Sequence, residues 1–198
     1  MRNLKKILAL LMTGIMLVLA AGCGGGSSSN SSSGSGAKAP SNGKRVGVAM
    51  PTQSSQRWIQ DGANMKQKLE ALGYEVDLQY AEDDVQAQVS QIENMITNGA
   101  NCLVVASIDS SALVNALAQA KANNIPVIAY DRLLMDTDSV SYYATFDNKG
   151  VGTLIGKYVE KKLGLAEGKG PYNVEFFAGS PDDNNAHFLN DGLFEVLK

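Results

Sequence analysis

From residue 44 onward, short runs of β-branched and other apolar residues alternate with segments of helical periodicity. The apolar runs predict strands at 45–50, 74–80, 101–106, 126–130, 141–146 and 172–177. The periodic segments predict helices at 56–72, 84–98, 110–123, 148–163 and from about 184. Runs 101–106 and 126–130 are apolar almost throughout, which is typical of strands covered on both faces. This order predicts an α/β fold with a doubly wound parallel sheet.

The first 23 residues indicate where such a fold works. Basic residues at 2, 5 and 6 precede an uncharged apolar run from 7 to 21, which is short for a membrane span but suits a signal peptide. The run ends in small residues before Cys23 and resembles the lipobox of bacterial lipoproteins, in which this cysteine is lipidated. The alternative is an ordinary signal peptide with an incidental cysteine. Residues 24–43 read as a Ser/Gly-rich tether with a span of about 25 Å.

Charge and cysteine content limit the partners of the remaining domain. Three of the 17 basic residues and none of the 20 acidic residues lie in the leader, so the processed chain is more acidic than the formal net charge of −3. An acidic exported domain without basic clusters is not expected to bind nucleic acid or anionic lipid. Cys102 has no disulfide partner once Cys23 is lipidated, and it is predicted to be a buried strand residue. A single histidine, His187, excludes a His-rich metal site, and no cofactor is expected.

Polar clusters directly follow the predicted strands, where an open parallel sheet binds its ligands. Their hydrogen-bonding groups suit the adjacent hydroxyls of a sugar, and the flat faces of Trp58, Tyr130 and Phe146 suit its C–H face. The candidate ligand-binding residues are Arg57, Trp58, Asp109, Asp131, Arg132, Phe146, Asp147, Asn148, Asn184 and Asn185.

Several of these residues also have a structural explanation. Trp58 is in phase with the apolar face of its helix and is as well suited to core packing as to stacking. Asp109, Asp147 and the pair at 183–184 are good helix N-caps, and Asp131 with Arg132 would also make a surface ion pair. His187 is expected on a helix surface or in packing.

Enzymatic motifs are not found. The turn at 50–56 contains no glycine, so it matches neither a dinucleotide fingerprint nor a phosphate-binding loop. No G-x-S-x-G elbow is present. Paired acids at 82–84 and 182–183 are interpreted as helix-start residues. We therefore expect no catalysis.

Five segments together resemble the type I periplasmic sugar-binding proteins of ABC transporters, in particular the multiple-sugar-binding and xylose-binding receptors. These segments lie at 50–58, 91–95, 129–132, 143–148 and 179–186. The resemblance implies two doubly wound lobes that close on a monosaccharide. It also implies that Arg57, Asp131 and Arg132 hold the sugar from the first lobe. Asp147, Asn148, Asn184 and Asn185 would approach from the second lobe, with Trp58 and Phe146 available for stacking.

The resemblance further implies a receptor that delivers its sugar to an ABC permease. Together with the lipobox-like leader, it predicts a lipid-anchored protein on the extracytoplasmic face of the cell envelope. A chemosensory protein of the same fold, which presents its ligand to a chemoreceptor or sensor kinase, is the alternative. An exported hydrolase is a weaker one.

The predicted domain organisation is a signal peptide with lipidated Cys23, a tether at 24–43, a first lobe at 44–146 and the start of a second lobe at 147–198. Because nothing after the last helix continues the sheet, we expect an incomplete second lobe. Its apolar side chains at 174, 176, 177, 193 and 194 would then have no sheet to cover them.

Overall fold

The structure, a computed structural model, describes residues 43–198. The proposed lipidation site, Cys23, and nearly all of the tether lie outside the described residues.

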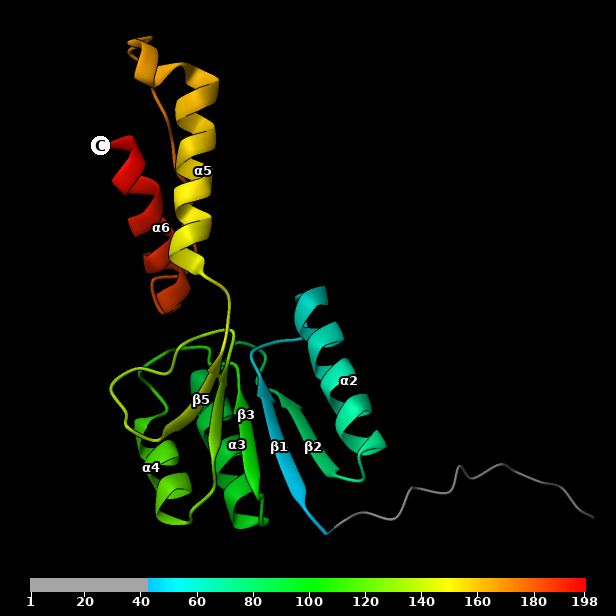
Figure 1. The fold of residues 1–198 in the computed structure, drawn as a ribbon. Helices are drawn as coiled ribbons and strands as arrows, with labels where there is room; N and C mark the ends of the chain where they lie inside the picture. Colours follow the sequence, from blue (N-terminus) through cyan, green and yellow to red (C-terminus); the bar gives the residue numbers. More distant parts are fainter. Residues whose placement is uncertain (1–42) are drawn as a thin grey trace, which may run out of the picture. The chain divides into compact units, whose positions relative to one another are not determined.

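Five of the six predicted strands form one sheet, which is parallel as the sequence predicted (Figure 1). They are β1 (Arg45–Met50), β2 (Glu75–Tyr80), β3 (Cys102–Val105), β4 (Val127–Tyr130) and β5 (Val140–Ala144). Their order in the sheet is β2-β1-β3-β4-β5, and every neighbouring pair is parallel. Because the strands are parallel, their carboxyl ends lie along one edge of the sheet, where a ligand site is expected.

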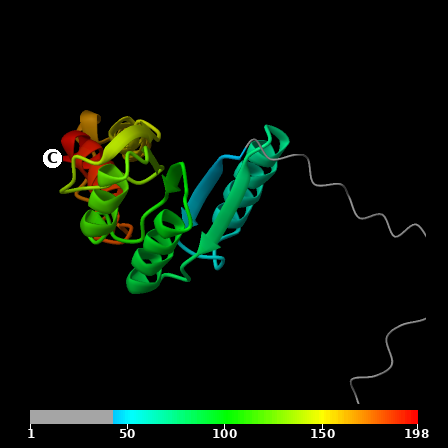
Figure 2. The same cartoon turned by 90° about the horizontal axis from the view of Figure 1, so that it is seen from below.

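Three helices cover the two faces of this sheet. Helix α2 (Gln56–Ala71) lies on one face, and α3 (Val85–Thr97) and α4 (Val114–Ala122) lie on the other (Figures 1 and 2). Within β1, Val46 and Val48 pack toward α2, whereas Ala49 packs toward α3 and α4. Strands β3 and β4 divide their side chains between the same two clusters. This double coverage explains why their sequences are apolar on both faces.

Local sequence signals set most of the helix ends. The Asp84 carboxylate caps α3 by accepting hydrogen bonds from the backbone N–H groups of Gln86 and Ala87. Gly99 follows that helix with φ of +79°, a left-handed conformation in which glycine carries no steric penalty.

The predicted start of the helix at residue 110 is wrong, because α4 begins only at Val114. Asp109 was expected to cap this helix. Its carboxylate instead accepts hydrogen bonds from the backbone N–H groups of Ser111 and Ala112 within the preceding turn. That turn satisfies these donors locally, and the helix begins after Leu113.

Two further helices and a short 3₁₀ turn make up the C-terminal part. They are α5 (Asn148–Leu163), η1 (Leu165–Glu167) and α6 (Asn184–Leu197). Helices α5 and α6 run side by side (Figure 1) and approach closely at glycines. A Cβ atom at Gly152 would lie 2.0 Å from the Leu189 carbonyl oxygen, and one at Gly192 would lie 2.0 Å from that of Lys149. The close packing of these helices therefore depends on two positions without side chains.

The predicted strand at 172–177 is wrong. Residues 169–180 adopt no helix or strand, because within residues 43–198 no strand lies beside them to form a ladder. The segment packs near α6 instead, with the Phe176 ring edge-on to that of Phe194 at a centroid distance of 5.2 Å. Phe177 is 96% exposed, as expected for an uncovered residue. The prediction of an uncovered side chain is wrong for Leu193, which is buried where α6 packs against α5.

Helix α5 carries an exposed apolar stripe. Val151, Leu154, Ile155 and Tyr158 recur at the spacing of one helix face, and all four are exposed.

Cys102 is a strand residue as predicted, but it is only half-buried because it opens β3. Burial still raises the pKa of its thiol. Among residues 43–198, no helix is long and apolar enough to cross a membrane. The same part of the chain holds no cluster of three or more His, Cys, Asp or Glu side chains suited to a metal ion.

Candidate functional site

The structure brings together Arg57, Trp58, Asp131 and Arg132 at the carboxyl ends of β1 and β4. Arg57 and Trp58 lie in the first turn of α2, shortly after β1, and the other two directly follow β4. Strand β3 separates β1 from β4 in the sheet, so the two segments reach each other across the end of that strand. This juxtaposition was expected from the position of these residues after parallel strands.

An ion pair between Arg57 and Asp131 lies at the centre of the site. The Nη2 atom of Arg57 donates to Oδ2 of Asp131 at 2.5 Å, and the Asp131 residue is only 7% exposed. Burial of the guanidinium opposes its charge, but the hydrogen bond and the negative charge of Asp131, aided by Asp61, together raise the pKa of Arg57 above its ordinary value. The site therefore presents a fixed donor beside a fixed acceptor.

Asp131 also anchors the backbone around it. Its φ of +62° is in the left-handed region, which aspartate tolerates better than most residues. Its carbonyl oxygen accepts hydrogen bonds from Thr145 Oγ1 at 2.7 Å, Tyr143 Oη at 3.3 Å and Asn185 Nδ2 at 3.1 Å. These three donors hold the unusual backbone conformation and connect it to β5, to the segment before α5 and to α6.

Trp58 is a core residue that also borders the site. It is 6% exposed and packs with Val46, Val48 and Met50 of β1. The guanidinium carbon of Arg57 lies 4.4 Å from its ring centroid, and that of Arg132 lies 5.4 Å away. Core packing and a place beside the site are therefore compatible for Trp58, because its ring packs in the core and also lies against both arginines.

Arg132 joins three segments. Its Nη1 donates to the carbonyl oxygen of Ser107 at 2.8 Å, and its Nε lies 3.0 Å from Oδ2 of Asp183. Asp183 in turn caps α6 by accepting from the backbone N–H of Asn185 at 3.0 Å. The arginine thus connects the loop after β3 to the start of α6.

Asn185 and Asn148 extend this network from the C-terminal helices. The buried Asn185 amide donates to Oδ1 of Asp131 at 3.2 Å and accepts from Nδ2 of Asn148 at 2.9 Å. Asn148 Nδ2 also lies 3.3 Å from Thr145 Oγ1. Asn185 therefore contacts Asp131 directly, and Asn148 is connected to it through Asn185.

The other candidates lie at the margin or make structural contacts. Phe146 is 70% exposed and lines the cavity described below. Asp147 caps α5 by accepting from the backbone N–H of Gly150. Asn184 is the first residue of α6 and precedes Asn185. Asp109 makes its hydrogen bonds within the turn before α4 and does not line the cavity. His187 lies on the helix surface near the Pro181 carbonyl oxygen, which agrees with the structural alternative for it.

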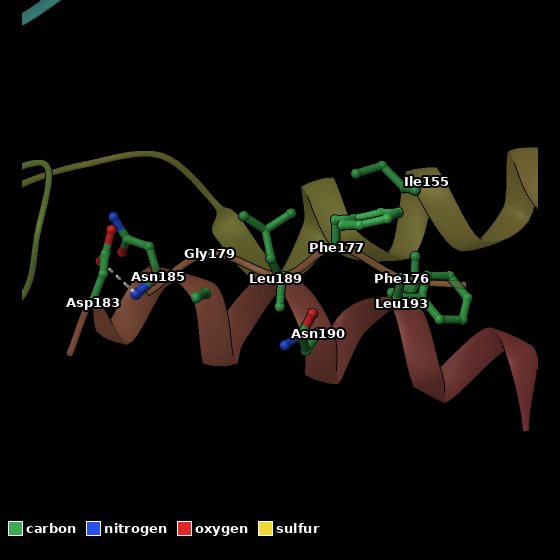
Figure 3. Close-up of a pocket in the computed structure, with 11 residues that line it drawn as sticks. Ile155, Phe176, Phe177, Gly179, Asp183, Asn185, Leu189, Asn190 and Leu193 are labelled. Carbon is green, nitrogen blue, oxygen red and sulfur yellow. Dashed lines mark hydrogen bonds between the residues drawn. The ribbon is translucent and has the colours of Figure 1, made fainter. Parts of the chain in front are cut away.

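Two cavities lie near these residues. One, of about 210 Å³, is lined by Arg57, Tyr130, Asp131, Ala144, Thr145 and Phe146. It is smaller than the roughly 300–1,000 Å³ typical of ligand pockets. The other, of about 280 Å³, lies between α5 and α6 (Figure 3), with Asp183 and Asn185 at one end and Phe176 and Phe177 at the other. Only the first combines an ion pair, a hydroxyl and aromatic faces.

Thr145, Asp61 and Asp183 were absent from the predicted site. Thr145 contacts the Asp131 backbone, Asp61 contacts Arg57, and Asp183 contacts Arg132. The spacing of four residues between Arg57 and Asp61 on one helix could have indicated that pair. Nothing in the sequence pattern singled out Thr145.

Residues 46–198 match the periplasmic binding protein domain family. Relatives include the multiple sugar-binding periplasmic protein SbpA of Azospirillum brasilense and the multiple sugar-binding periplasmic receptor ChvE of Rhizobium radiobacter, each 54% identical over 153 residues. The D-xylose-binding periplasmic protein of Escherichia coli is 36% identical over 154 residues. These alignments cover 77–78% of this chain, but the chain spans only 43–44% of each relative.

A similar solved structure is an ABC transporter solute-binding protein from Clostridium phytofermentans with bound β-D-glucose. It is 61% identical to this chain and superposes with a TM-score of 0.76. The alignment covers 78% of this chain and 48% of that one.

Proposed function

We propose that this chain, which belongs to the periplasmic binding protein domain family, captures a monosaccharide outside the cytoplasm for an ABC-type sugar importer. Binding, with no chemical step, is the activity. The observation that carries the proposal is the Arg57–Asp131 pair beside Thr145 and Phe146 around a cavity of about 210 Å³. A fixed cation and a fixed carboxylate match the alternating donors and acceptors of adjacent sugar hydroxyls.

The relatives support the same class of ligand. Two are named for binding multiple sugars and one for D-xylose, and a structure 61% identical to this chain holds β-D-glucose. We therefore propose a pentose or aldohexose, with D-glucose and D-xylose as the first candidates. Arg57 and Asp131 would contact the hydroxyls, and Phe146 would lie against the C–H face of the ring.

We also propose that residues 44–146 form one lobe of the receptor and that residues 147–198 begin the other. Asn148, Asn185 and Asp183 would then approach the ligand or its partners from the second side. The contacts of Asn185 with Asp131, of Asp183 with Arg132 and of Asn148 with Asn185 support this arrangement. Closure of two lobes around a ligand is a common way to desolvate a polar site.

The anchoring and the partner are further parts of the proposal. The lipobox-like residues before Cys23 favour a lipoprotein held at the extracytoplasmic face of the membrane. An ABC permease is the proposed partner, because a solute-binding protein of an ABC transporter is among the similar structures. A chemoreceptor or sensor kinase is the alternative partner.

Titration calorimetry of the purified chain with D-glucose, D-xylose and D-galactose tests the proposal. Because the cavity in residues 43–198 is small, we expect dissociation constants near the millimolar range, equivalent to about −4 kcal/mol. Asp131→Ala should remove the binding heat, and Asp138→Ala should not, since Asp138 is exposed and pairs with Lys121 on the surface. If none of the three sugars gives a signal, the sugar-binding proposal is wrong for this chain. Turnover of chromogenic glycosides or esters would favour the hydrolase.

A further inference from the structure

Asp61 lies one helical turn after Arg57 and makes two contacts that the sugar-binding proposal does not use. Its Oδ2 accepts a hydrogen bond from Arg57 Nε at 3.3 Å. The same oxygen accepts from the Tyr130 hydroxyl at 3.1 Å. Tyr130 ends β4, so Asp61 connects two segments that are 69 residues apart in the sequence.

These contacts hold the Arg57 guanidinium on three sides. Asp61 binds its Nε, Asp131 binds its Nη2, and the Trp58 ring lies 4.4 Å beneath its carbon atom. A free arginine side chain populates many rotamers, so a ligand that immobilises it must overcome the loss of that conformational entropy. When the fold already fixes the side chain, ligand binding does not carry this entropic cost. Arg57 is thus pre-organised where it lines the cavity.

A simpler explanation is an ordinary surface pair at the i,i+4 spacing, which stabilises a helix only slightly. Two observations argue against it. The Asp61 side chain is 26% exposed, whereas Glu70, the acid of the Lys66–Glu70 pair at the same spacing on the same helix, is 41% exposed. Asp61 also accepts from Tyr130, a residue that lines the cavity itself.

We propose that Asp61 is a positioning residue of the sugar site, which together with Tyr130 fixes the Arg57 guanidinium between Trp58 and Asp131. This inference rests on the proposed sugar-binding function. It gives α2 a role in affinity through a residue that does not itself line the cavity. Tyr130 acts as the second anchor, because its hydroxyl restrains Asp61 from the opposite segment.

A double-mutant cycle tests the positioning role. The variants are Asp61→Asn, Arg57→Lys and both together, with Glu70→Gln as the matched control on the same helix. Asp61→Asn keeps the size of the side chain but removes its charge. We expect it to weaken D-glucose binding about tenfold. The double variant should bind no more weakly than Arg57→Lys alone, because Asp61 acts only through Arg57. Glu70→Gln should leave the affinity unchanged.

A spectroscopic measurement separates this inference from the sugar proposal. Trp58 is the single tryptophan of the chain, so its emission and near-UV circular dichroism report directly on the overlying guanidinium. Asp61→Asn should change both signals as Arg57→Lys does, without sugar, and the double variant should change them no further. If the wild type binds no sugar, the proposed function fails and these spectra still decide the positioning role. The positioning role would be overturned if Asp61→Asn had the same spectra as the wild type, or if the two substitutions weakened sugar binding additively.

Discussion

Arg57 and Asp131 are joined by a hydrogen bond of 2.5 Å although 74 residues separate them in the sequence. The pair connects the first turn of α2 to the residue that follows β4, and both side chains line the cavity. Asp131 is the more buried partner, so its carboxylate depends on the positive charge of Arg57 and on the hydrogen bond donated by Asn185. Loss of either contact leaves a buried charge with fewer partners, and that situation is costly.

Removing the Asp131 side chain should therefore destabilise the fold as well as the site. We expect Asp131→Ala to lower the free energy of unfolding by about 1–3 kcal/mol, since it leaves Arg57 and Asn185 without their carboxylate. Asp131→Asn should cost less, because asparagine keeps an acceptor and tolerates the φ of +62°. Urea unfolding followed by Trp58 emission measures both. Equal stabilities for the two variants would contradict this account.

Stability should fall in alkaline solution through Tyr130. Burial, and then the hydrogen bond and negative charge of Asp61, raise the pKa of the Tyr130 phenol above its ordinary value of 10.0. The Tyr130 phenol therefore ionises at a lower pH in the unfolded chain than in the folded chain. Its contribution to the free energy of unfolding is complete below about pH 10 and is lost as the pH rises through the folded-state pKa. Urea midpoints between about pH 8 and 11 should decline less steeply for Tyr130→Phe than for the wild type. The exposed Tyr158→Phe is the control, and an unchanged slope in Tyr130→Phe would rule out this source.

The packing of α5 on α6 should not tolerate a side chain at Gly152. A Cβ atom there would lie 2.0 Å from the backbone oxygen of Leu189, which cannot move without shifting α6. We expect Gly152→Ala to destabilise this helix pair by about 1–3 kcal/mol. Hydrogen exchange of the α6 amides should quicken, while β1, β3 and β4 stay protected. The exposed Val151→Ala should leave α6 unchanged, and slow exchange in Gly152→Ala would disprove the close approach.

Cys23 should determine where the protein resides. Because small residues precede it as in a lipobox, the wild type should carry an acyl group on Cys23 and fractionate with membranes. Cys23→Ser should be released as a soluble or unprocessed form. Mass spectrometry of the N-terminal peptide and fractionation measure the two properties. A wild-type protein that is soluble and lacks acyl mass would refute the lipoprotein proposal.

The sequence predicted the sheet well because its signals are local. Strand β1 and helix α5 have the predicted bounds, since a buried run or a helical period is readable without its neighbours. The meeting of Arg57 with Asp131 was also predictable, because parallel strands bring their carboxyl ends to one edge.

The errors arise where a distant partner decides the outcome. Segment 172–177 has the composition of a strand, but a strand requires a neighbour and residues 43–198 provide none. The spacing of Asp61 from Arg57 indicates at most a helix pair, and its contact with Tyr130, 69 residues away, cannot be predicted from the sequence pattern. The close approach of α5 and α6 depends on Gly152 and Gly192 facing backbone atoms, which periodicity does not reveal.

The exposed apolar stripe on α5 has a calorimetric consequence. Val151, Leu154, Ile155 and Tyr158 are already partly hydrated in the folded chain, and Phe177 almost fully. Unfolding therefore transfers less of this surface to water than it would for buried side chains, so these residues add less to the heat-capacity increment and to the denaturant m-value. Both quantities should fall below those of a domain of equal length, and the shortfall should come from residues after 147. The stability curve of the chain should therefore be flatter with temperature than its size alone implies.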